Sequence, residues 1–243
     1  MKNDNKPIAI IPLRSGSKRI PNKNIKLLNG KPLGSYVLES ALKSNIFKEI
    51  IVSTDKKEIY DTVYNGLSEY VENDCKKHIS LHLRSEELSG DKIQQEDVML
   101  NVIEEYEKNI EFNNVYLIQA TTPFTTPEDF INSYKLFLKN GCISMLSATK
   151  LKRFIWQYNN IIHNSGYFPI NYSPLDRPPM KDFGGSYIEN GAFYITKVSA
   201  LKLFKCRLVN KVGIYEMQGK GADIDIDDME DWEKAIKILK NEI

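Results

Sequence analysis

The sequence predicts an α/β fold built around a mostly parallel β-sheet. Short apolar runs of strand length alternate with longer segments that have helical spacing of apolar residues, which is the pattern of successive βα units. The chain has 243 residues, of which 42% are hydrophobic, so a sizeable core can form. We find no internal repeat and no low-complexity tract. One large domain, with at most a small insertion, is therefore the simplest interpretation.

The first five expected elements alternate between strand and helix. Residues 7–13 (PIAIIPL) form a continuous apolar run, which is typical of a buried strand. Residues 33–47 carry apolar and small side chains at helical spacing, and residues 49–55 (EIIVSTD) predict the next strand. A helix over about 56–67 and a strand over 78–84 (HISLHLR) continue the same alternation.

The middle of the chain repeats this order with clearer boundaries. Residues 94–107 have helical spacing, and residues 115–120 (VYLIQA) predict a strand that the following Thr-Thr-Pro ends. A helix over 127–138 comes next. Thr126 is its expected N-cap, and Pro127 occupies its first position, where a proline is well tolerated.

The pattern changes after the strand expected over 142–148. Residues 154–162 alternate like a β-hairpin, which Asn159-Asn160 could turn. Residues 164–186 contain four prolines and three glycines, and this irregular segment is too long for a routine connection. It is expected to be a lid, a substrate-binding excursion or an arm for oligomerisation. Regular patterns then return as two strands and a final helix, over residues 187–196, 211–217 and 228–240.

Composition excludes several classes of protein. The 33 basic and 32 acidic residues give a net charge of +1, which argues against a general binder of nucleic acids or membrane surfaces. No apolar stretch approaches the roughly 18 residues of a membrane span, and the first apolar run is too short for a signal peptide. Cys75, Cys142 and Cys206 form no CxxC pair, and three histidines make a His-rich metal site improbable. A soluble cytoplasmic protein is expected.

A basic loop follows the first predicted strand. Residues 14–31 (RSGSKRIPNKNIKLLNGK) contain six basic residues and no acidic one. The loop leaves the carboxyl end of a strand, where open α/β sheets bind ligands. Its small residues, Ser15, Gly16 and Ser17, allow the backbone to approach phosphate oxygens closely. Lys18, Arg19 and Lys23 add mobile positive charge. We interpret the loop as a triphosphate or pyrophosphate cradle; the alternative is a solvated basic loop. Neither GxxxxGK[ST] nor GxGxxG occurs, so ATPase and dehydrogenase interpretations lose their main support.

An acidic segment lies near the C-terminus. In extended backbone, Asp223, Asp225 and Asp227 share one face, while the two intervening isoleucines point into the core. Several carboxylates on one face repel one another unless a cation lies between them, and Mg²⁺ typically takes one or two carboxylates plus substrate phosphates. Alternatively, Asp227 or Asp228 caps the last helix, and both interpretations can hold together. With the basic loop, the segment indicates metal-assisted chemistry on a nucleoside triphosphate.

Several segments together resemble one family. The run IAIIPLRSGSKRIPNKNIKLLNGKPL at residues 8–33 resembles the opening motif of acylneuraminate cytidylyltransferases, the CMP-sialic acid synthetases. Further family-like segments follow in the family's order and span nearly the whole chain: IIVSTD at 50–55, LRSEEL at 83–88, LIQATTPF at 117–124, ENGAFYI at 189–195 and DIDIDDMED at 223–231.

The resemblance implies a fold, an assembly and a reaction. The fold is Rossmann-like, of the nucleotide-diphospho-sugar transferase type, with a small arm that exchanges across a homodimer whose active sites are shared. Residues 1–149 and 187–243 would then form the nucleotidyltransferase domain, and residues 150–186 the inserted arm, which serves dimerisation and sugar binding. The reaction joins CTP to a nine-carbon 2-keto-3-deoxy sugar acid with Mg²⁺ or Mn²⁺, and gives a CMP-sugar and pyrophosphate.

The resemblance also assigns roles to matching residues. Arg14, Lys23 and Asp225 are implied as catalytic, and Asp225, Asp227 and Asp223 as metal-binding. Contacts to the nucleotide are implied for Leu13, Arg14, Ser15, Gly16, Ser17, Lys18, Asn24 and Arg84. Contacts to the sugar are implied for Gln119, Thr121, Thr122, Glu189, Asn190 and Gly191. Simpler alternatives exist for three of these: a solvated Lys23, a Gln119 that only satisfies a backbone group, and a hairpin turn at Asn190-Gly191.

The sequence departs from the family mainly on the sugar side. The arginine of the family's QPTSPLR segment is missing, because Thr125 stands in its place. Gln94 and Gln95 occupy the position of a Ser/Thr-rich run and can still donate hydrogen bonds to the nucleotide. Arg177 or Lys181 must supply the positive charge of an Arg-Gln-Asp-Leu-Pro-like stretch. We therefore hypothesise a sugar acid other than N-acetylneuraminate, such as legionaminate, pseudaminate or a deaminated neuraminate.

Three alternatives to this function stay open at the level of sequence. A cytidylyltransferase for the eight-carbon 3-deoxy-octulosonate has a similar opening loop but fits the LIQATTP and DIDID segments less well. A non-catalytic CTP-binding relative would keep the loop without turnover. A nucleic-acid-binding module is the most distant alternative, because the basic residues gather in one loop and not along a helix face.

Overall fold

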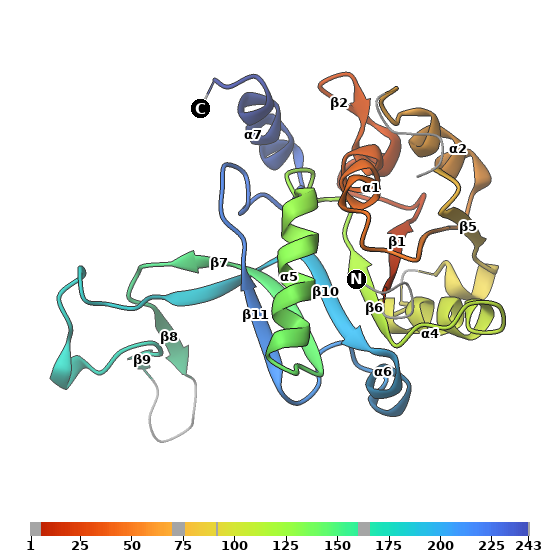
Figure 1. Cartoon of the computed structure of the whole chain (residues 1–243). Coiled ribbons are helices and arrows are strands. Elements are labelled where there is room, and N and C mark those ends of the chain that lie inside the picture. Colours follow the sequence, from red (N-terminus) through yellow and green to blue (C-terminus); the bar gives the residue numbers. More distant parts are fainter. Residues whose placement is uncertain (1–5, 70–75, 91, 160–165, 243) are drawn as a thin grey trace.

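A computed structural model describes residues 6–69, 76–90, 92–159 and 166–242 (Figure 1). Its central sheet has seven strands in the order β11-β7-β10-β6-β1-β4-β5. Only β10 runs antiparallel to its neighbours, β6 and β7, while the other pairs are parallel, so the predicted mostly parallel sheet is confirmed. The strands are β1 (Ile8–Leu13), β4 (Glu49–Thr54), β5 (Ile79–Leu83), β6 (Asn114–Ile118), β7 (Ser144–Leu151), β10 (Ser186–Lys197) and β11 (Val212–Glu216).

Helices cover both faces of this sheet. They are α1 (Leu33–Ser44), α2 (Lys57–Asn65), α4 (Gln95–Tyr106), α5 (Pro127–Lys139), α6 (Val198–Phe204) and α7 (Met229–Leu239). The core on one face is shared with α1, α2 and α5, and the core on the other face is shared with α4 and α6. A third, smaller cluster packs α7 against the basic loop. The predicted helices are confirmed, and α6 is an additional helix of seven residues.

Strand β1 shows why a continuous apolar run predicted a buried strand. Ala9, Ile11 and Leu13 point into the core beside α1 and α5, and Ile8 and Ile10 point into the core beside α4. Successive side chains alternate between the faces of a strand, so both sets must be apolar when helices cover both faces.

The parallel strands bring four loops to one edge of the sheet. Strands β1, β4, β5 and β6 are neighbours and run in the same direction. The residues that immediately follow them are Arg14, Asp55, Arg84 and Gln119. Carboxyl ends of parallel strands meet at one edge, where α/β sheets bind ligands. The fold therefore gathers four polar side chains from distant parts of the chain.

An arm projects from the body of the molecule. Strands β7 and β10 run outward together, and the chain between them carries a hairpin of β8 (Trp156–Asn159) and β9 (Gly166–Pro169) (Figure 1). The boundaries expected for the inserted segment, at residues 150 and 186, fall at the end of β7 and the start of β10.

The predicted hairpin within residues 154–162 is wrong in its pairing. Asn159 lies in β8 and pairs with Gly166, so the partner strand comes from further along the chain. Asn160 and the rest of the expected turn lie outside the described residues. Phe154 belongs to no strand; its ring packs 4.4 Å from that of Tyr172, measured between centroids. Alternation identified one strand correctly but could not identify its partner, because pairing depends on loop length.

A β-bulge replaces the turn considered at Asn190-Gly191. Both residues lie inside β10, where the register against β7 shifts between Glu189 and Tyr194. Gly191 has a positive φ of 70°, which suits a bulge as well as a turn. The hairpin-turn interpretation is therefore wrong, and the bulge aims this part of β10 at the carboxyl edge of the sheet.

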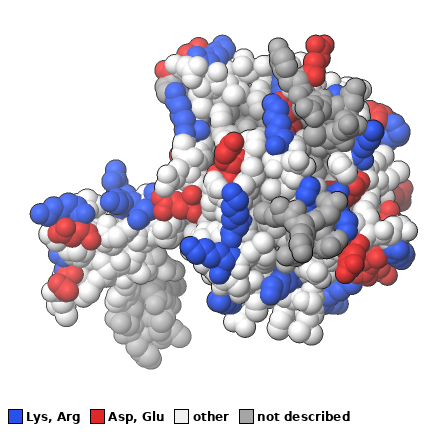
Figure 2. All heavy atoms as spheres, in the orientation of Figure 1, with Lys and Arg blue, Asp and Glu red and all other residues white. Residues whose placement is uncertain are grey.

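Charge is mixed over the visible surface. Figure 2 shows lysine and arginine side chains interspersed with acidic ones on the face drawn there. This distribution agrees with the near balance of 33 basic and 32 acidic residues. Within the described parts of the chain, no helix is long and apolar enough to cross a membrane.

Candidate active site

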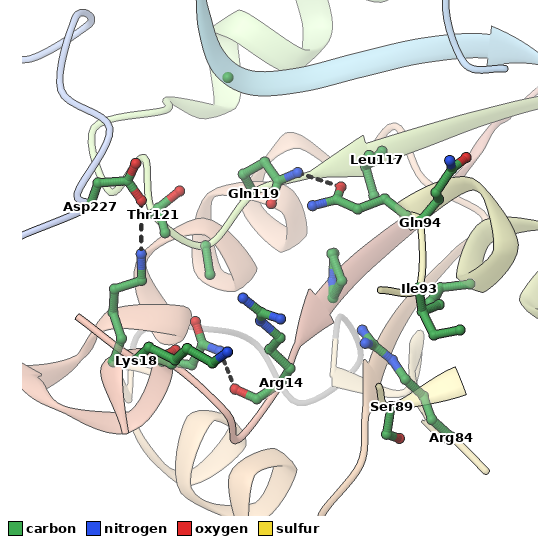
Figure 3. Close-up of a pocket in the computed structure, with 18 of the residues that line it drawn as sticks. Arg14, Lys18, Arg84, Ser89, Ile93, Gln94, Leu117, Gln119, Thr121 and Asp227 are labelled. Carbon is green, nitrogen blue, oxygen red and sulfur yellow. Dashed lines mark hydrogen bonds and ion pairs between the residues drawn. The ribbon is translucent and has the colours of Figure 1, made fainter. Parts of the chain in front are cut away.

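A cleft of about 630 Å³ lies at the carboxyl edge of the sheet. The basic loop forms one wall, and the N-terminus of α4 and the acidic segment form others. Figure 3 shows the guanidinium groups of Arg14 and Arg84 directed toward its middle, with Gln119 and Thr121 across from them. The predicted site residues that line the cleft are Arg14, Ser17, Lys18, Lys23, Asn24, Arg84, Gln94, Gln95, Gln119, Thr121, Gly191, Asp225 and Asp227.

Internal hydrogen bonds hold the basic loop in place. The backbone N–H of Ser15 donates to Asp55 Oδ1 at 2.9 Å, and its hydroxyl donates to Asp55 Oδ2. Asn24 Nδ2 donates to the carbonyl oxygen of Arg14 at 2.9 Å. Burial acts to raise the pKa of Asp55, but the Ser15 hydrogen bonds and the charge of Arg84 outweigh it and keep this pKa below its usual value. Asp55 is thus a charged anchor for the start of the loop.

Lys23 connects the basic loop to the acidic segment. Its Nζ donates to the carbonyl oxygen of Ile226 at 2.6 Å and lies 3.5 Å from Asp227 Oδ1. Only 13% of its side chain is exposed, so the solvated-lysine alternative is wrong. Arg19 also pairs with Asp227, at 3.0 Å. The sequence marked Arg19 only as additional charge, although it too lines the cleft.

The acidic segment has the alternation expected of extended backbone. Ile224 and Ile226 are buried, and the aspartates between and beside them are exposed. Asp225 and Asp227 line the cleft, whereas Asp223 lines a neighbouring cavity. Asp228 caps α7 by accepting the backbone N–H groups of Glu230 and Asp231 at 2.9 and 3.1 Å. The carboxylates that line the cleft, Asp225 and Asp227, are therefore different residues from Asp228, which caps the helix.

The environment of Asp225 suits a cation. Asp225 keeps contact with solvent but is partly buried against the cleft wall, and this partial burial is the largest influence that raises its pKa. A hydrogen bond from Thr121 lowers the pKa, and the negative charge of Asp227 raises it further. Gly191 faces it so closely that a Cβ there would lie 3.0 Å from Asp225 Oδ2. Among the residues that the structure describes, no three His, Cys, Asp or Glu side chains converge on one point. Two carboxylates completed by substrate phosphates are a set that fits Mg²⁺.

Gln119 is held by the N-terminus of α4. Its Nε2 donates to Gln95 Oε1 at 2.6 Å, so its amide does not merely satisfy a backbone group and that alternative is wrong. Its own backbone N–H donates to the Ala192 carbonyl at 3.0 Å, which ties β6 to the bulge in β10. Gln94 is the N-cap of α4, in a reciprocal capping box with Asp97.

The remaining predicted residues do not line the cleft; they are Leu13, Ser15, Gly16, Thr122, Arg177, Lys181, Glu189, Asn190 and Asp223. Leu13 and Thr122 are buried, and Asn190 is turned to the Ala222 carbonyl, 2.7 Å away. Arg177 lies on the arm, with its guanidinium 4.6 Å from the centre of the Phe154 ring. The sequence could not reveal these positions, because a motif shows which segment a residue belongs to but not the direction in which its side chain points.

Several cleft residues were not expected from the sequence. Ser89, Gly90 and Ile93 follow LRSEEL, and Tyr194 belongs to ENGAFYI. The Tyr194 hydroxyl donates to Glu189, and burial and this carboxylate raise the pKa of Tyr194 to about 12. Its place inside a recognised segment was the only available signal, because an aromatic residue on a strand usually packs in the core.

Comparison with known proteins shows to which family the chain is similar. The sequence profile of the cytidylyltransferase family matches residues 8–153. A CMP-N,N'-diacetyllegionaminic acid synthase of Legionella pneumophila is 30% identical over 247 residues, covering 96% of both chains. N-acylneuraminate cytidylyltransferase A of Danio rerio is 32% identical over 90% of this chain but only 48% of its own length. This chain thus spans about half the length of that relative.

A solved structure shares the fold. A CMP:2-keto-3-deoxy-manno-octonic acid synthetase complexed with CTP superimposes with a TM-score of 0.67 over 98% of this chain and 100% of its own, at 17% identity. At that identity the likeness concerns the fold alone. The family profile and the Legionella relative, which matches end to end, carry the stronger conclusion: the chain belongs to the cytidylyltransferase family.

Proposed function

We propose that the protein is a cytidylyltransferase that joins CTP to a nine-carbon 2-keto-3-deoxy sugar acid and releases pyrophosphate. One observation carries this proposal: a single cleft is lined both by the cations of the basic loop and Arg84 and by the carboxylates Asp225 and Asp227. Such an arrangement suits a triphosphate that bridges positive side chains and a metal ion. Membership of the cytidylyltransferase family supports CTP as the nucleotide.

The reaction is a displacement at phosphorus. The anomeric hydroxyl of the sugar acid loses its proton as its oxygen bonds to the α-phosphorus, and the bond from that phosphorus to the β-phosphate oxygen breaks. Negative charge builds on the phosphoryl oxygens and on the leaving pyrophosphate, so positioned cations lower the barrier most. We assign Arg14 and Lys18 to the phosphates and Lys23 to the transferring group.

Lys23 is well placed for this role because it is already fixed. Its ammonium group lies between Asp227 and the Ile226 carbonyl before substrate enters. Asp225 and Asp227 would hold Mg²⁺ or Mn²⁺ together with substrate oxygens, and the metal would supply Lewis-acid charge at the phosphates. The contacts to Asp227 and to the Ile226 carbonyl hold the Lys23 ammonium group at the wall of the cleft.

The sugar acid is proposed to differ from N-acetylneuraminate. Thr125, buried in this structure, stands where many family members have an arginine, so that cation is not replaced from the same segment. The Legionella relative is named for N,N'-diacetyllegionaminic acid and matches this chain end to end, which supports a sugar of the legionaminate type. Gln119 and Thr121, to which we assign contacts with the sugar acid, are polar groups that line the cleft.

We further propose a homodimer in which the arm of one copy completes the cleft of the other. The arm exposes large apolar side chains that a monomer would leave in water: Trp156, Tyr158, Tyr167, Phe168, Ile170, Leu175 and Met180. Arg177 and Lys181 lie on this arm and outside their own cleft. A second copy would therefore bring both cations to the sugar acid. We also propose that the reaction takes place in the cytoplasm.

Pyrophosphate release from CTP tests the proposal. The panel contains legionaminate, pseudaminate, N-acetylneuraminate, deaminated neuraminate and 3-deoxy-octulosonate, each with Mg²⁺. Release with a nine-carbon acid is expected, and Asp225→Ala should abolish it. Preference for the eight-carbon acid would favour the octulosonate alternative. No pyrophosphate release with any acid of the panel, with CTP still bound, would favour the non-catalytic relative. The highest kcat/KM for N-acetylneuraminate would contradict the proposed sugar.

A further inference from the structure

A chain of hydrogen bonds runs from the cleft into the protein interior. Arg84 donates from Nε to the Ser53 hydroxyl at 2.9 Å and from Nη2 to the Ser53 carbonyl at 2.9 Å. Ser53 Oγ lies 2.9 Å from His82 Nδ1, and His82 Nε2 lies 2.9 Å from Asn101 Oδ1. Ser53 is fully buried and His82 is 3% exposed. The chain thus joins a cleft arginine to β4, β5 and α4.

Only one placement of the protons gives each hydrogen bond in this chain one donor and one acceptor. Arginine can only donate, so Ser53 Oγ accepts from Arg84, and a carboxamide oxygen can only accept, so His82 Nε2 carries a proton. The Ser53 hydroxyl then donates to an unprotonated Nδ1. His82 is therefore neutral, in the Nε2–H form.

The surroundings of His82 agree with a neutral ring. Burial is the main influence and lowers the pKa of His82, and the positive charge of Arg84 acts in the same direction. The hydrogen bond with Asn101 and the charge of Glu105, both from α4, oppose this effect. Glu105 Oε2 lies 3.6 Å from Nε2 and is more than half exposed, so solvent weakens its pull.

Protonation of His82 would disturb the arginine. Nδ1–H would become a second donor to Ser53 Oγ, and the serine proton would have to find another acceptor in a buried place. Two cations would also stand on either side of one hydroxyl. Arg84 has little freedom to absorb this change, because two of its guanidinium nitrogens already donate to Ser53. Burial lowers the pKa of Arg84 to about 10, although the charge of Asp55 acts to raise it.

We propose that His82 is a positioning residue whose neutral imidazole, acting through Ser53, orients the Arg84 guanidinium toward the nucleotide. The proposal rests on the proposed function, which makes CTP the ligand of Arg84. His82 itself does not line the cleft. Its effect on CTP therefore passes through the arginine, which Figure 3 shows directed into the cleft.

The first test is CTP binding by calorimetry, without sugar acid or turnover. His82→Leu removes the acceptor for Ser53, and we expect CTP to bind roughly threefold to tenfold more weakly, the size of one lost hydrogen bond. His82→Asn places an amide oxygen near Nδ1 and should restore most of the affinity. His78→Asn, in the turn immediately before β5 and exposed, is the matched control. In turnover, KM for CTP should rise in His82→Leu while KM for the sugar acid stays constant. Unchanged CTP affinity in folded His82→Leu would overturn the proposal.

The second test is the pH profile of CTP binding. Wild-type affinity should fall as His82 becomes protonated below its ordinary pKa of about 6.5. The CTP phosphates titrate in the same range, but equally for every variant, so the difference from His82→Asn isolates the imidazole. Asn101→Asp would favour the protonated ring and should move the fall to higher pH. Identical profiles in wild type and His82→Asn would contradict the proposal.

A third measurement does not depend on the proposed function. The chain has three histidines, so nitrogen NMR with His82→Asn and His78→Asn assigns the His82 ring. A protonated Nε2 and a bare Nδ1 are expected, together with an Arg84 Nε–H signal that shifts in His82→Leu. A protonated Nδ1 would overturn the proposed chain of bonds. Failure of the wild type to bind CTP, with the expected ring state present, would instead contradict the proposed function.

Discussion

Asp223 and Asp225 lie two residues apart on one extended segment, yet their surroundings differ. Asp225 reaches the cleft beside Asp227 and Gly191, whereas Asp223 lines only the neighbouring cavity. We expect Asp225→Asn to lower kcat by at least about a hundredfold, a size typical of lost electrostatic stabilisation in a transition state. Asp223→Asn is the matched control and should stay within about threefold of wild type. Pyrophosphate release measures both, and equal losses would argue against a special role for Asp225.

Gly191 has a positive φ and almost no room for a side chain. A Cβ would approach Asp225 Oδ2 to 3.0 Å at a φ of 70°. Gly191→Ala should therefore cost about 1–2 kcal/mol of unfolding free energy and displace the Asp225 carboxylate, which lowers kcat. Gly184→Ala is the control, because nothing lies within 4 Å of a Cβ there and its φ is not positive. Denaturant unfolding and turnover should separate the two variants; matching results would contradict this account.

At the residue scale, the sequence predicted which residues line the cleft better than it predicted which side chains contact one another. Arg14, Lys23, Asp225 and Asp227 all line the cleft, as their segments indicated. Asp55 was not expected to anchor Ser15, since its importance comes only from the pairing of β1 with β4. Such contacts join residues about forty positions apart, and periodicity carries no information about them.

Glu39 shows how one buried carboxylate can connect several elements. It lies on α1 and accepts hydrogen bonds from Lys31 of the β2 (Leu27–Leu28)–β3 (Lys31–Pro32) hairpin, from Lys43 of α1 and from Ser68 beyond α2. Burial acts to raise the pKa of Glu39, but these hydrogen bonds outweigh burial and bring it to about 2. The folded protein thus holds this group ionised far below its ordinary range.

This depressed pKa predicts a loss of stability in acid. The contribution of ionised Glu39 to the free energy of unfolding is complete above the ordinary glutamate pKa of about 4.3. It disappears as the pH falls toward about 2. Allowing for solvent screening, the contribution is roughly 1–2 kcal/mol. Glu39→Gln should lose that amount at pH 7 and show a shallower decline in acid. Asp61→Asn breaks an exposed pair with Lys57 and should cost less than about 0.5 kcal/mol. Urea unfolding between pH 7 and pH 3 measures both, and parallel profiles for Glu39→Gln and wild type would refute this role.

At the element scale, what could be predicted depended on burial and length. Strands that are buried on both faces showed continuous apolar runs, and helices of nine residues or more showed a helical spacing of apolar residues, so both could be predicted. Helix α6 was missed because seven residues hold too few turns for a period to appear. The partner of β8 was misassigned because local alternation does not determine the length of the connecting loop.

At the scale of the whole molecule, the arm decides whether one chain is sufficient for catalysis. Arg177 and Lys181 lie on the arm and outside their own cleft, so the proposed dimer must bring them to the other copy. The double variant Arg177→Ala, Lys181→Ala should then lose turnover with the sugar acid while it binds CTP normally. Sedimentation should show a dimer in both wild type and variant, since the exposed aromatic side chains of the arm are unchanged.

Mixing two inactive variants distinguishes shared sites from self-contained ones. One variant carries Asp225→Asn with an intact arm, and the other carries the arm double variant with an intact Asp225. After unfolding and refolding together, half of the dimers are mixed, and one of the two sites in each mixed dimer has an intact cleft and an intact arm. Activity should therefore recover to about a quarter of wild type, as the two-fold symmetry of a homodimer requires. If each arm serves its own cleft, every site in a mixed dimer still combines a cleft and an arm of the same chain, and one of the two is altered. The mixture will then stay inactive. Each variant refolded alone is the control.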